Sequence, residues 1–360
     1  MRGLWIGLLI VSSLGLAQTP AAPSPYAVRF EQAWKLVKER YYLTDFNGAD
    51  WEALGTQYRA KLGQVKSWNQ LYALLGDLYD ELKDDHSTVL SPELARRYLG
   101  GGQCQALPFR DSDLFPQGAP SAPNPQSQTP ETQNPQAQTQ PPAQSQPPQT
   151  TPPQPRPDAS PSVSAYAQPT VRFTDGVVVV RVSNLVDVLG LNALRDAIRQ
   201  YDSRARGYVL DIRGNPGGLA LRMAEVTGLF MVAVPWRLVV RGLGGVPFST
   251  TPIPPFGRPL TSKPLALLID GGVNSAAEGL AGALKESKRA YVIGTRTAGN
   301  VEALTPYCFP DGGVALVANG VLAPFRGATW EGRGVEPDLV IEDRNQQLEE
   351  AIRYIRNLRR

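Results

Sequence analysis

The stretch Tyr208-Val209-Leu210-Asp211-Ile212-Arg213-Gly214-Asn215-Pro216-Gly217-Gly218 decides the fold class of this 360-residue chain. Its first half, together with residue 207, is an apolar run typical of a buried strand, and its second half is a glycine-rich turn. The segment from Ala220 to Phe230 then has helical character. A buried strand that passes through a tight turn into a helix is the repeating unit of α/β proteins.

The same unit recurs along the second half of the chain, where apolar runs alternate with helical patterns. The predicted elements are strands over 177–182, 207–212, 264–269, 290–293 and 314–317, and helices over 191–201, 220–230 and 276–285. An amphipathic pattern over 344–360 predicts a C-terminal helix. We therefore expect an α/β core sheet with flanking helices over residues 169–343.

Residues 25–112 predict a small helical domain in front of this core, because apolar residues recur there at three- and four-residue spacings. Ser67, with Gln70 three residues later, is typical of a capped helix start. We expect the helix that follows to end near Lys83. This places His86 just beyond a helix.

Two further segments are predicted to lie outside the packed domains. Residues 1–17 combine a basic start, a short apolar run and small residues, as in a secretory signal peptide, and an uncleaved membrane anchor is the alternative. Residues 113–168 are rich in Pro, Gln, Ser and Thr and lack the apolar side chains that offset ordering entropy. They predict a disordered linker, with a binding site for a partner as the alternative.

Composition excludes several classes of function. The net charge of +3 comes from scattered Lys and Arg residues, so no nucleic-acid binding is expected. One His and two Cys, without the spacing of metal ligands, predict no metal site, and we expect no cofactor. The signal peptide predicts a secreted or periplasmic protein without stable membrane insertion after cleavage.

One serine and the only histidine are candidates for nucleophilic chemistry. Ser275 follows Asp270-Gly271-Gly272-Val273-Asn274 at a second strand-to-helix turn, where its hydroxyl is exposed and the N–H of Ala276 is free to donate. His86 stands in Asp84-Asp85-His86-Ser87-Thr88, and any serine chemistry that uses an imidazole requires it. The plainer interpretations are a helix N-cap at Ser275 and a solvated loop at His86.

The glycine-rich turn is a candidate anion site. Consecutive N–H groups in Gly214-Asn215-Pro216-Gly217-Gly218 can point at one spot and form an oxyanion hole. A phosphate-binding turn is disfavoured because neither a Gly-Lys-Ser sequence nor a dinucleotide glycine pattern is present. A plain tight loop remains the alternative.

Taken together, the motifs closely resemble the S41 peptidases, which include the C-terminal (tail-specific) processing proteases. The motifs are Tyr208 to Gly218, Asn274-Ser275-Ala276-Ala277-Glu278, Gly294 to Asn300, Pro310-Asp311-Gly312 and Gly334-Val335-Glu336-Pro337-Asp338. The resemblance covers residues 169–341, and residues 75–88 resemble the family's N-terminal helical region. It implies a ClpP/crotonase-like core and a serine endopeptidase that acts on polypeptides. It also implies Ser275 as nucleophile, with oxyanion donors from Ala276 and from Gly217 or Gly218.

The chain departs from many processing proteases at the catalytic base. Asn300 stands where they have a Lys, and Leu304 where they have a Gln, so a Ser-Lys dyad is excluded. A second branch of the family has a Ser-His-Glu arrangement, in which the N-terminal motif supplies the base. The resemblance to that branch implies that His86 takes the Ser275 proton. Glu302 is the candidate that orients His86.

Other acidic residues are weaker candidates for this orienting role. Glu278 is expected to pack beneath the nucleophile, and the side chains of Asp84 and Asp85 are expected to point away from the neighbouring His86.

A further departure is that the linker stands where processing proteases commonly have a PDZ domain. Recognition of a defined C-terminal tail is therefore not implied.

Several alternatives remain open at this point. Loss of the Lys is compatible with a catalytically inactive S41-like module that binds peptides or acts as a scaffold, and an esterase or acyl transferase could use the same groups. Formation of a homo-oligomer is left open. Cys104 follows the His86 region and Cys308 follows the Asn300 loop, so a disulfide between them would clamp the two regions together. Two separate thiols are the alternative.

Overall fold

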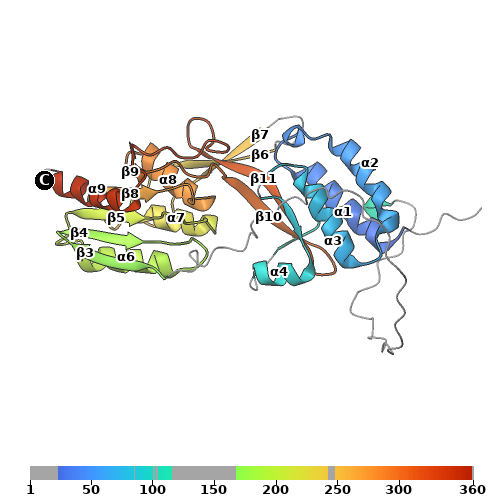
Figure 1. Ribbon diagram of the computed structural model, residues 1–360, viewed down its shortest axis with the longest axis horizontal. Coiled ribbons are helices and arrows are strands. Elements are labelled where there is room, and N and C mark those ends of the chain that lie inside the picture. Colours follow the sequence, from blue (N-terminus) through green and yellow to red (C-terminus); the bar gives the residue numbers. More distant parts are fainter. Residues whose placement is uncertain are drawn as a thin grey trace, which may run out of the picture.

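The computed structural model describes residues 23–84, 86–99, 102, 104–115, 168–241 and 248–358. The predicted signal peptide, and residues 116–167 of the linker predicted at 113–168, lie outside the described residues; the start of that predicted linker lies in a short helix over Asp111–Leu114. The N-terminal helices occupy one end of the molecule and the α/β core the other (Figure 1). The long strands β10 (Glu302–Cys308) and β11 (Val314–Pro324) run between them.

The core sheet has six strands, in the spatial order β12-β9-β8-β5-β4-β3. All neighbouring pairs are parallel except β3 with β4, which is antiparallel. The bounds are β3 (Thr170–Thr174), β4 (Val177–Arg181), β5 (Gly207–Asp211), β8 (Leu265–Ile269), β9 (Tyr291–Gly294) and β12 (Leu339–Val340). The strands that the sequence predicted at 177–182, 207–212, 264–269 and 290–293 are therefore confirmed. Their near-continuous apolar runs follow from burial on both faces.

Helices cover both faces of this sheet, and alternate side chains of one strand divide between them. Val178 and Val180 of β4 belong to the large core that includes α6 (Leu189–Tyr201), α7 (Ala220–Gly228) and α8 (Ala276–Glu286). Val177 and Val179 pack instead in the cluster that includes α9 (Arg344–Asn357). The two-residue period of a strand produces this division. The predicted α/β core with flanking helices and a C-terminal helix is confirmed.

A second sheet joins the core to the N-terminal region and was mostly missed by sequence analysis. Its order is β2-β10-β11-β6-β7, and β1 also pairs with β11. Only residues 314–317 of this sheet were predicted as a strand, and the prediction that they continue the core sheet is wrong, because β11 pairs with β10, β6 and β1 instead. The remaining bounds are β1 (Thr88–Leu90), β2 (Gln105–Ala106), β6 (Trp236–Arg241) and β7 (Phe248–Ile253). β1 and β2 are short and β7 is exposed, so these three strands lack the apolar run that marks the core strands.

The N-terminal region contains the predicted helices, packed against β11 and β1. Ser67 Oγ accepts a hydrogen bond from the N–H of Gln70, but Gln70 Oε1 accepts from Lys66 rather than from Ser67. The helix ends at Asp80, slightly before the predicted position. The bounds are α1 (Pro25–Arg40), α2 (Trp51–Lys61), α3 (Trp68–Asp80), α4 (Pro92–Leu99) and α5 (Asp111–Leu114), with single 3-10 turns at Phe46–Gly48 and Leu62–Gln64.

A covalent link also joins the two regions. Cys104, just before β2, is bonded to Cys308 at the end of β10, with 5.6 Å between the Cα atoms. The adjacent β2 and β10 pair in parallel at this point. The segment that follows α4 is therefore fixed to the hairpin of β10 and β11, which carries Glu302 at its other end.

A buried ion pair connects α1 to the turn between β10 and β11. Arg29 Nη1 lies 2.6 Å from Asp311 Oδ1, and the two side chains are 4% and 5% exposed. The Tyr72 hydroxyl lies 2.8 Å from Asp311 Oδ2, and the Arg29 guanidinium stacks over the Phe309 ring at 4.4 Å. The only sequence signal for this contact was the Pro-Asp-Gly motif, whose partner in α1 lies far away in the chain.

Replacing Asp311 with alanine is expected to lower the free energy of unfolding by about 3–5 kcal/mol, because it leaves the Arg29 charge buried without its partner. Urea denaturation followed by circular dichroism measures the change. The double variant Arg29→Met/Asp311→Leu removes both charges and is expected to recover part of the loss. A double variant less stable than Asp311→Ala would contradict this account.

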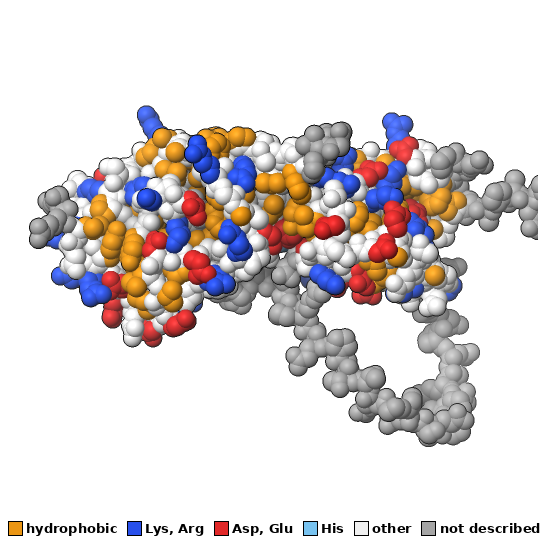
Figure 2. All heavy atoms as spheres, turned by 90° about the horizontal axis from the view of Figure 1, so that it is seen from above, with side chains coloured by type: hydrophobic (Ala, Val, Ile, Leu, Met, Phe, Trp, Pro, Cys, Tyr) orange, Lys and Arg blue, Asp and Glu red, His pale blue; other side chains and the backbone are white. Residues whose placement is uncertain are grey.

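Both signs of charge are interspersed over the face seen in Figure 2. Within the described residues, no helix combines the length and the apolar character needed to cross a bilayer.

Candidate active site

Ser275 occupies a strained turn between β8 and α8. Its backbone has φ 54° and ψ −126°, a conformation that residues with a Cβ rarely adopt. Three contacts hold the turn: the N–H of Asn274 donates to Asn215 O at 3.0 Å, the N–H of Ser275 donates to Asn300 O at 2.9 Å, and Ala277 N–H returns to Asn274 O at 3.0 Å. Strain of this kind persists only where the surroundings impose it, and it is frequent at catalytic turns.

Glu278 lies beneath the turn, as the sequence predicted. Its fully buried carboxylate accepts hydrogen bonds from four donors, one at Ser275 itself and three in residues 297–300. They are the N–H of Ser275 at 3.2 Å, Thr297 Oγ1 at 2.5 Å, the N–H of Gly299 at 2.7 Å and the N–H of Asn300 at 2.8 Å. Glu278 therefore fastens the Asn300 loop to the serine turn.

The glycine-rich turn packs directly against the serine. A Cβ on Gly217, which has φ +95°, would lie 2.8 Å from the Cβ of Ser275 and 3.0 Å from the N of Ala276. The N–H of Gly217 donates to Asn215 Oδ1 at 2.9 Å, so this donor is already in use. Within the described chain, no hydrogen bond uses the N–H of Gly218 or of Ala276. Gly218 and Ala276 are thus the pair of donors that the fold leaves available.

His86 and Glu302 meet although 216 positions separate them in the sequence. Nδ1 of His86 lies 2.9 Å from Oε2 of Glu302, and the two side chains are 14% and 4% exposed. Asp84 shapes the loop by accepting from the N–H groups of His86 and Ser87 at 3.1 and 2.6 Å. The hydroxyl of Ser87 accepts from the N–H of Ala318 at 3.0 Å, which anchors the loop to β11.

The charges around His86 favour its protonated form. Burial lowers the pKa of His86, but the hydrogen bond and charge of Glu302, with the charges of Glu331 and Asp84, outweigh burial and hold the pKa above its ordinary value. Because Glu302 engages Nδ1, the tautomer it favours carries the proton there and leaves Nε2 as the acceptor.

Glu331 is a residue that the sequence analysis missed. It lies between β11 and β12, and its Oε2 accepts from the N–H of Val301 at 2.7 Å. Burial raises the pKa of Glu331 to about 7, the N–H of Val301 opposes this, and the negative charge of Glu302 adds to it. Glu331 therefore changes its charge near neutral pH. No local sequence pattern marks it, because only the return of the chain after β11 brings it to Glu302.

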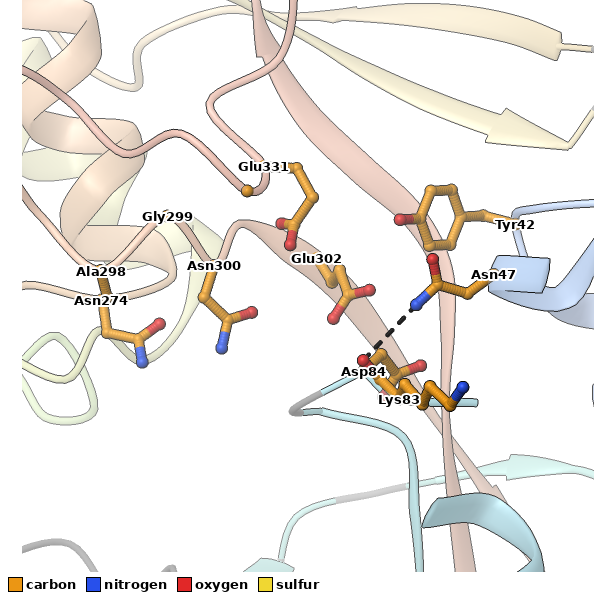
Figure 3. Close-up of a pocket in the computed structure, with 11 residues that line it drawn as sticks. Tyr42, Asn47, Lys83, Asp84, Asn274, Ala298, Gly299, Asn300, Glu302 and Glu331 are labelled. Carbon is orange, nitrogen blue, oxygen red and sulfur yellow. Dashed lines mark hydrogen bonds between the residues drawn. The ribbon is translucent and has the colours of Figure 1, made fainter. Parts of the chain in front are cut away.

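A cavity of about 360 Å³ connects the serine turn to the histidine loop. Asn274, Gly299 and Asn300 line it on the serine side, with Glu302 and Glu331 at its centre and Asp84 and Tyr42 across from them (Figure 3). Its volume lies in the usual range of ligand sites. Among the residues that the structure describes, no hydrogen bond links the Ser275 hydroxyl to His86. The cavity is thus lined by chain neighbours of both Ser275 and His86, although neither of these two side chains is itself among its lining residues.

Comparison with known proteins gives a family for most of the core. Residues 177–341 match the profile of Peptidase family S41, and residues 24–80 match that of the Tricorn protease C1 domain. A carboxy-terminal-processing protease of Bartonella bacilliformis is 32% identical over 155 residues, covering 41% of this chain and 35% of that protein. A carboxyl-terminal-processing protease of Picosynechococcus sp. is 24% identical over 347 residues, covering 86% of this chain and 82% of that protein.

Among solved structures, the photosystem II D1 C-terminal processing protease aligns with a TM-score of 0.58 at 18% identity, covering 93% of this chain and 98% of that one. At this identity the likeness concerns the fold, and it agrees with the predicted α/β core behind a helical N-terminal region. The alignment with the Bartonella protein spans only about a third of that protein's length, whereas the alignment with the Picosynechococcus protein spans most of it.

Proposed function

Because residues 177–341 belong to peptidase family S41, we propose that this chain is an exported serine endopeptidase that hydrolyses peptide bonds of unfolded polypeptides. The observation that carries the proposal is the contact of Glu302 with Nδ1 of the only histidine, beside a strained serine turn that has two unused N–H groups. An imidazole held at one nitrogen, with the other free to accept a proton, is what a serine nucleophile requires.

In the proposed reaction, Nε2 of His86 removes the proton from Ser275 as Oγ attacks the carbonyl carbon. The carbonyl oxygen becomes negative and accepts hydrogen bonds from the N–H groups of Gly218 and Ala276. His86 then gives the proton to the leaving amine as the C–N bond breaks. Water repeats the sequence on the acyl-enzyme and restores Ser275. His86 and Ser275 close on each other when substrate fills the cavity, since catalytic contacts often tighten only in the complex.

Cleavage of an unfolded model protein, together with labelling by a fluorophosphonate probe, tests the proposal. The chain starting at Gln18 is expected to cleave the protein and to take up one label, and Ser275→Ala is expected to do neither. Ser287→Ala is the matched control, because Ser287 lies at the far end of α8 with its hydroxyl bonded to Ala283 O at 2.6 Å. Absence of both cleavage and labelling in the wild type would favour a peptide-binding module without catalysis.

Export rests on the sequence of residues 1–17, and we propose that the mature protein begins at Gln18 outside the cytoplasm. Amino-terminal sequencing of the protein recovered from the secreting host tests this. A chain that keeps Met1 and stays with the membrane fraction would contradict it and would favour the uncleaved anchor.

Replacing Glu302 with Gln is expected to move the acidic limb of the kcat/KM profile to lower pH. Activity requires neutral His86 and is lost as pH falls through its pKa, which Glu302 raises. Without that charge and hydrogen bond, burial is opposed only by the charges of Glu331 and Asp84, and the pKa of His86 falls. The lower limb therefore shifts to more acidic pH while kcat decreases, by as much as about 10⁴-fold if the wrong tautomer forms. An unchanged acidic limb of the kcat/KM profile would show that a group other than His86 sets it.

A further inference from the structure

Two asparagine side chains beside the serine turn have no partner of their own. Oδ1 of Asn274 and Oδ1 of Asn300 are both buried, and neither carboxamide makes a hydrogen bond within the described part of the chain. Buried polar atoms without a partner are uncommon in folded proteins, and each one calls for an explanation. Both side chains line the cavity of the candidate active site.

The main-chain N–H and C=O groups at these two positions all make hydrogen bonds, so the backbone that carries each carboxamide is held in place. Asn274 donates its N–H to Asn215 O and accepts from Ala277, at 3.0 Å each. Asn300 donates its N–H to Glu278 at 2.8 Å and accepts from the N–H of Ser275 at 2.9 Å. Each carboxamide is therefore attached to a fixed backbone position next to Ser275. Asn274 precedes Ser275 in the chain, and Asn300 is joined to it by a main-chain hydrogen bond.

The direction of the side chains agrees with a role in binding. In Figure 3 the two carboxamides point in the same direction on the serine side of Glu302, and both residues line the cavity. Asn47 also lines the cavity, but its Nδ2 donates to Leu82 O at 3.0 Å, so it has a structural partner. Asn274 and Asn300 differ from it because nothing in the described chain uses them.

Resting on the proposed function, we propose that Asn274 and Asn300 form a main-chain binding site that holds the peptide groups next to the scissile bond. A carboxamide offers one acceptor and two donors, so a pair can bind both the N–H and the C=O of a substrate residue. Rotation of the terminal torsion exchanges the oxygen and the nitrogen, which lets each side chain meet either group. Such contacts read the polypeptide backbone rather than a particular side chain, as in recognition of an extended strand.

The experiment compares a peptide and its two ester analogues on four proteins. One substrate is an eight-residue peptide spanning a bond that the wild type cleaves in the unfolded model protein. In each of the other two substrates, an ester replaces the peptide group on one side of the scissile bond, which removes one N–H donor. The proteins are the wild type, Asn274→Ala, Asn300→Ala and the control Asn319→Ala, whose carboxamide donates to Thr305 Oγ1 at 2.6 Å outside the cavity.

We expect the ester to lower kcat/KM of the wild type and of Asn319→Ala by about 3- to 10-fold, as one lost hydrogen bond does. Asn274→Ala or Asn300→Ala should lower kcat/KM on the peptide by a similar factor, mainly through KM, and should lose the discrimination against the ester at one position. Equal ester sensitivity in all four proteins overturns the binding site. In that case the protease proposal stands, because cleavage still depends on Ser275.

Binding to the Ser275→Ala protein separates the two proposals further. Its affinity for the same peptide, measured by fluorescence anisotropy, should fall about 3- to 10-fold for each added Asn→Ala change. If the wild type cleaves no protein, endopeptidase activity is refuted. The proposed binding site is then tested by the affinity of the same variants for the unfolded protein itself. Unchanged affinity of Asn274→Ala/Asn300→Ala would then refute the binding site as well.

Discussion

Replacing His86 with alanine is expected to lower kcat/KM by about 10⁴-fold or more, and replacing Ser275 with alanine by a similar factor, because each removes one part of a single proton-transfer unit. The double variant is expected to be no worse than either single variant. Groups that act as a unit are strongly non-additive, since removal of the first leaves the second without a task. Steady-state cleavage of one fluorogenic peptide by the three variants measures this.

The structure makes this prediction sharp because His86 has no substitute. It is the only histidine in the chain, and Asn300 cannot accept a proton from Ser275 as an unprotonated Lys could. If the loss of kcat/KM in the double variant equalled the product of the two single losses, His86 and Ser275 would act separately. A His86→Ala enzyme with near-wild-type kcat/KM would exclude histidine as the base. Unchanged thermal unfolding of each variant is the control for folding.

Replacing Glu278 with alanine is expected to lower the free energy of unfolding by about 3 kcal/mol or more, since leaving one buried donor unpaired costs about 1–3 kcal/mol and three donors lose this acceptor. The expected activity loss, about 10²-fold or more, arises because the serine turn and the Asn300 loop are no longer fastened together and the reacting groups are misplaced. Chemical denaturation and kcat/KM measure the two effects.

Two further variants of helix α8 make this result interpretable. Glu286→Ala removes an exposed carboxylate from the same helix and is expected to change neither quantity. Glu278→Gln keeps the size of the side chain but turns an amide N–H toward groups that also donate, so it is expected to be intermediate. Wild-type stability in Glu278→Ala would show that other contacts hold the serine turn.

The cysteines illustrate how far the linear sequence reaches. The order of motifs placed Cys104 and Cys308 after two regions expected to meet, and the structure pairs them between β2 and β10. Glu302 is the sequence-based candidate because it is expected in the loop that carries Asn300, and in the structure its Oε2 lies 2.9 Å from Nδ1 of His86. The role of Glu302 in catalysis remains a prediction, which the Glu302→Gln variant tests.

Other features of the site left no trace in local patterns. Gly217 and Gly218 were equivalent as oxyanion donors in the sequence, but Asn215 already engages the N–H of Gly217. Glu331 reaches the cavity only because β11 returns the chain to the start of β10. Asn300 was noted for the Lys it replaces, and only the structure revealed a carboxamide without a partner.

The sequence by itself determined the α/β core, the strand-to-helix position of Ser275 and the identity of the single histidine, because these depend on apolar periodicity and residue type within short windows. Only the tertiary structure decided which donors remain free, how the second sheet carries β1 and Glu302 to the same place, and which carboxyl groups share the cavity. Those facts depend on contacts between residues hundreds of positions apart, such as His86 with Glu302 and Arg29 with Asp311. Such contacts form through the packing of the whole chain, which no local pattern encodes.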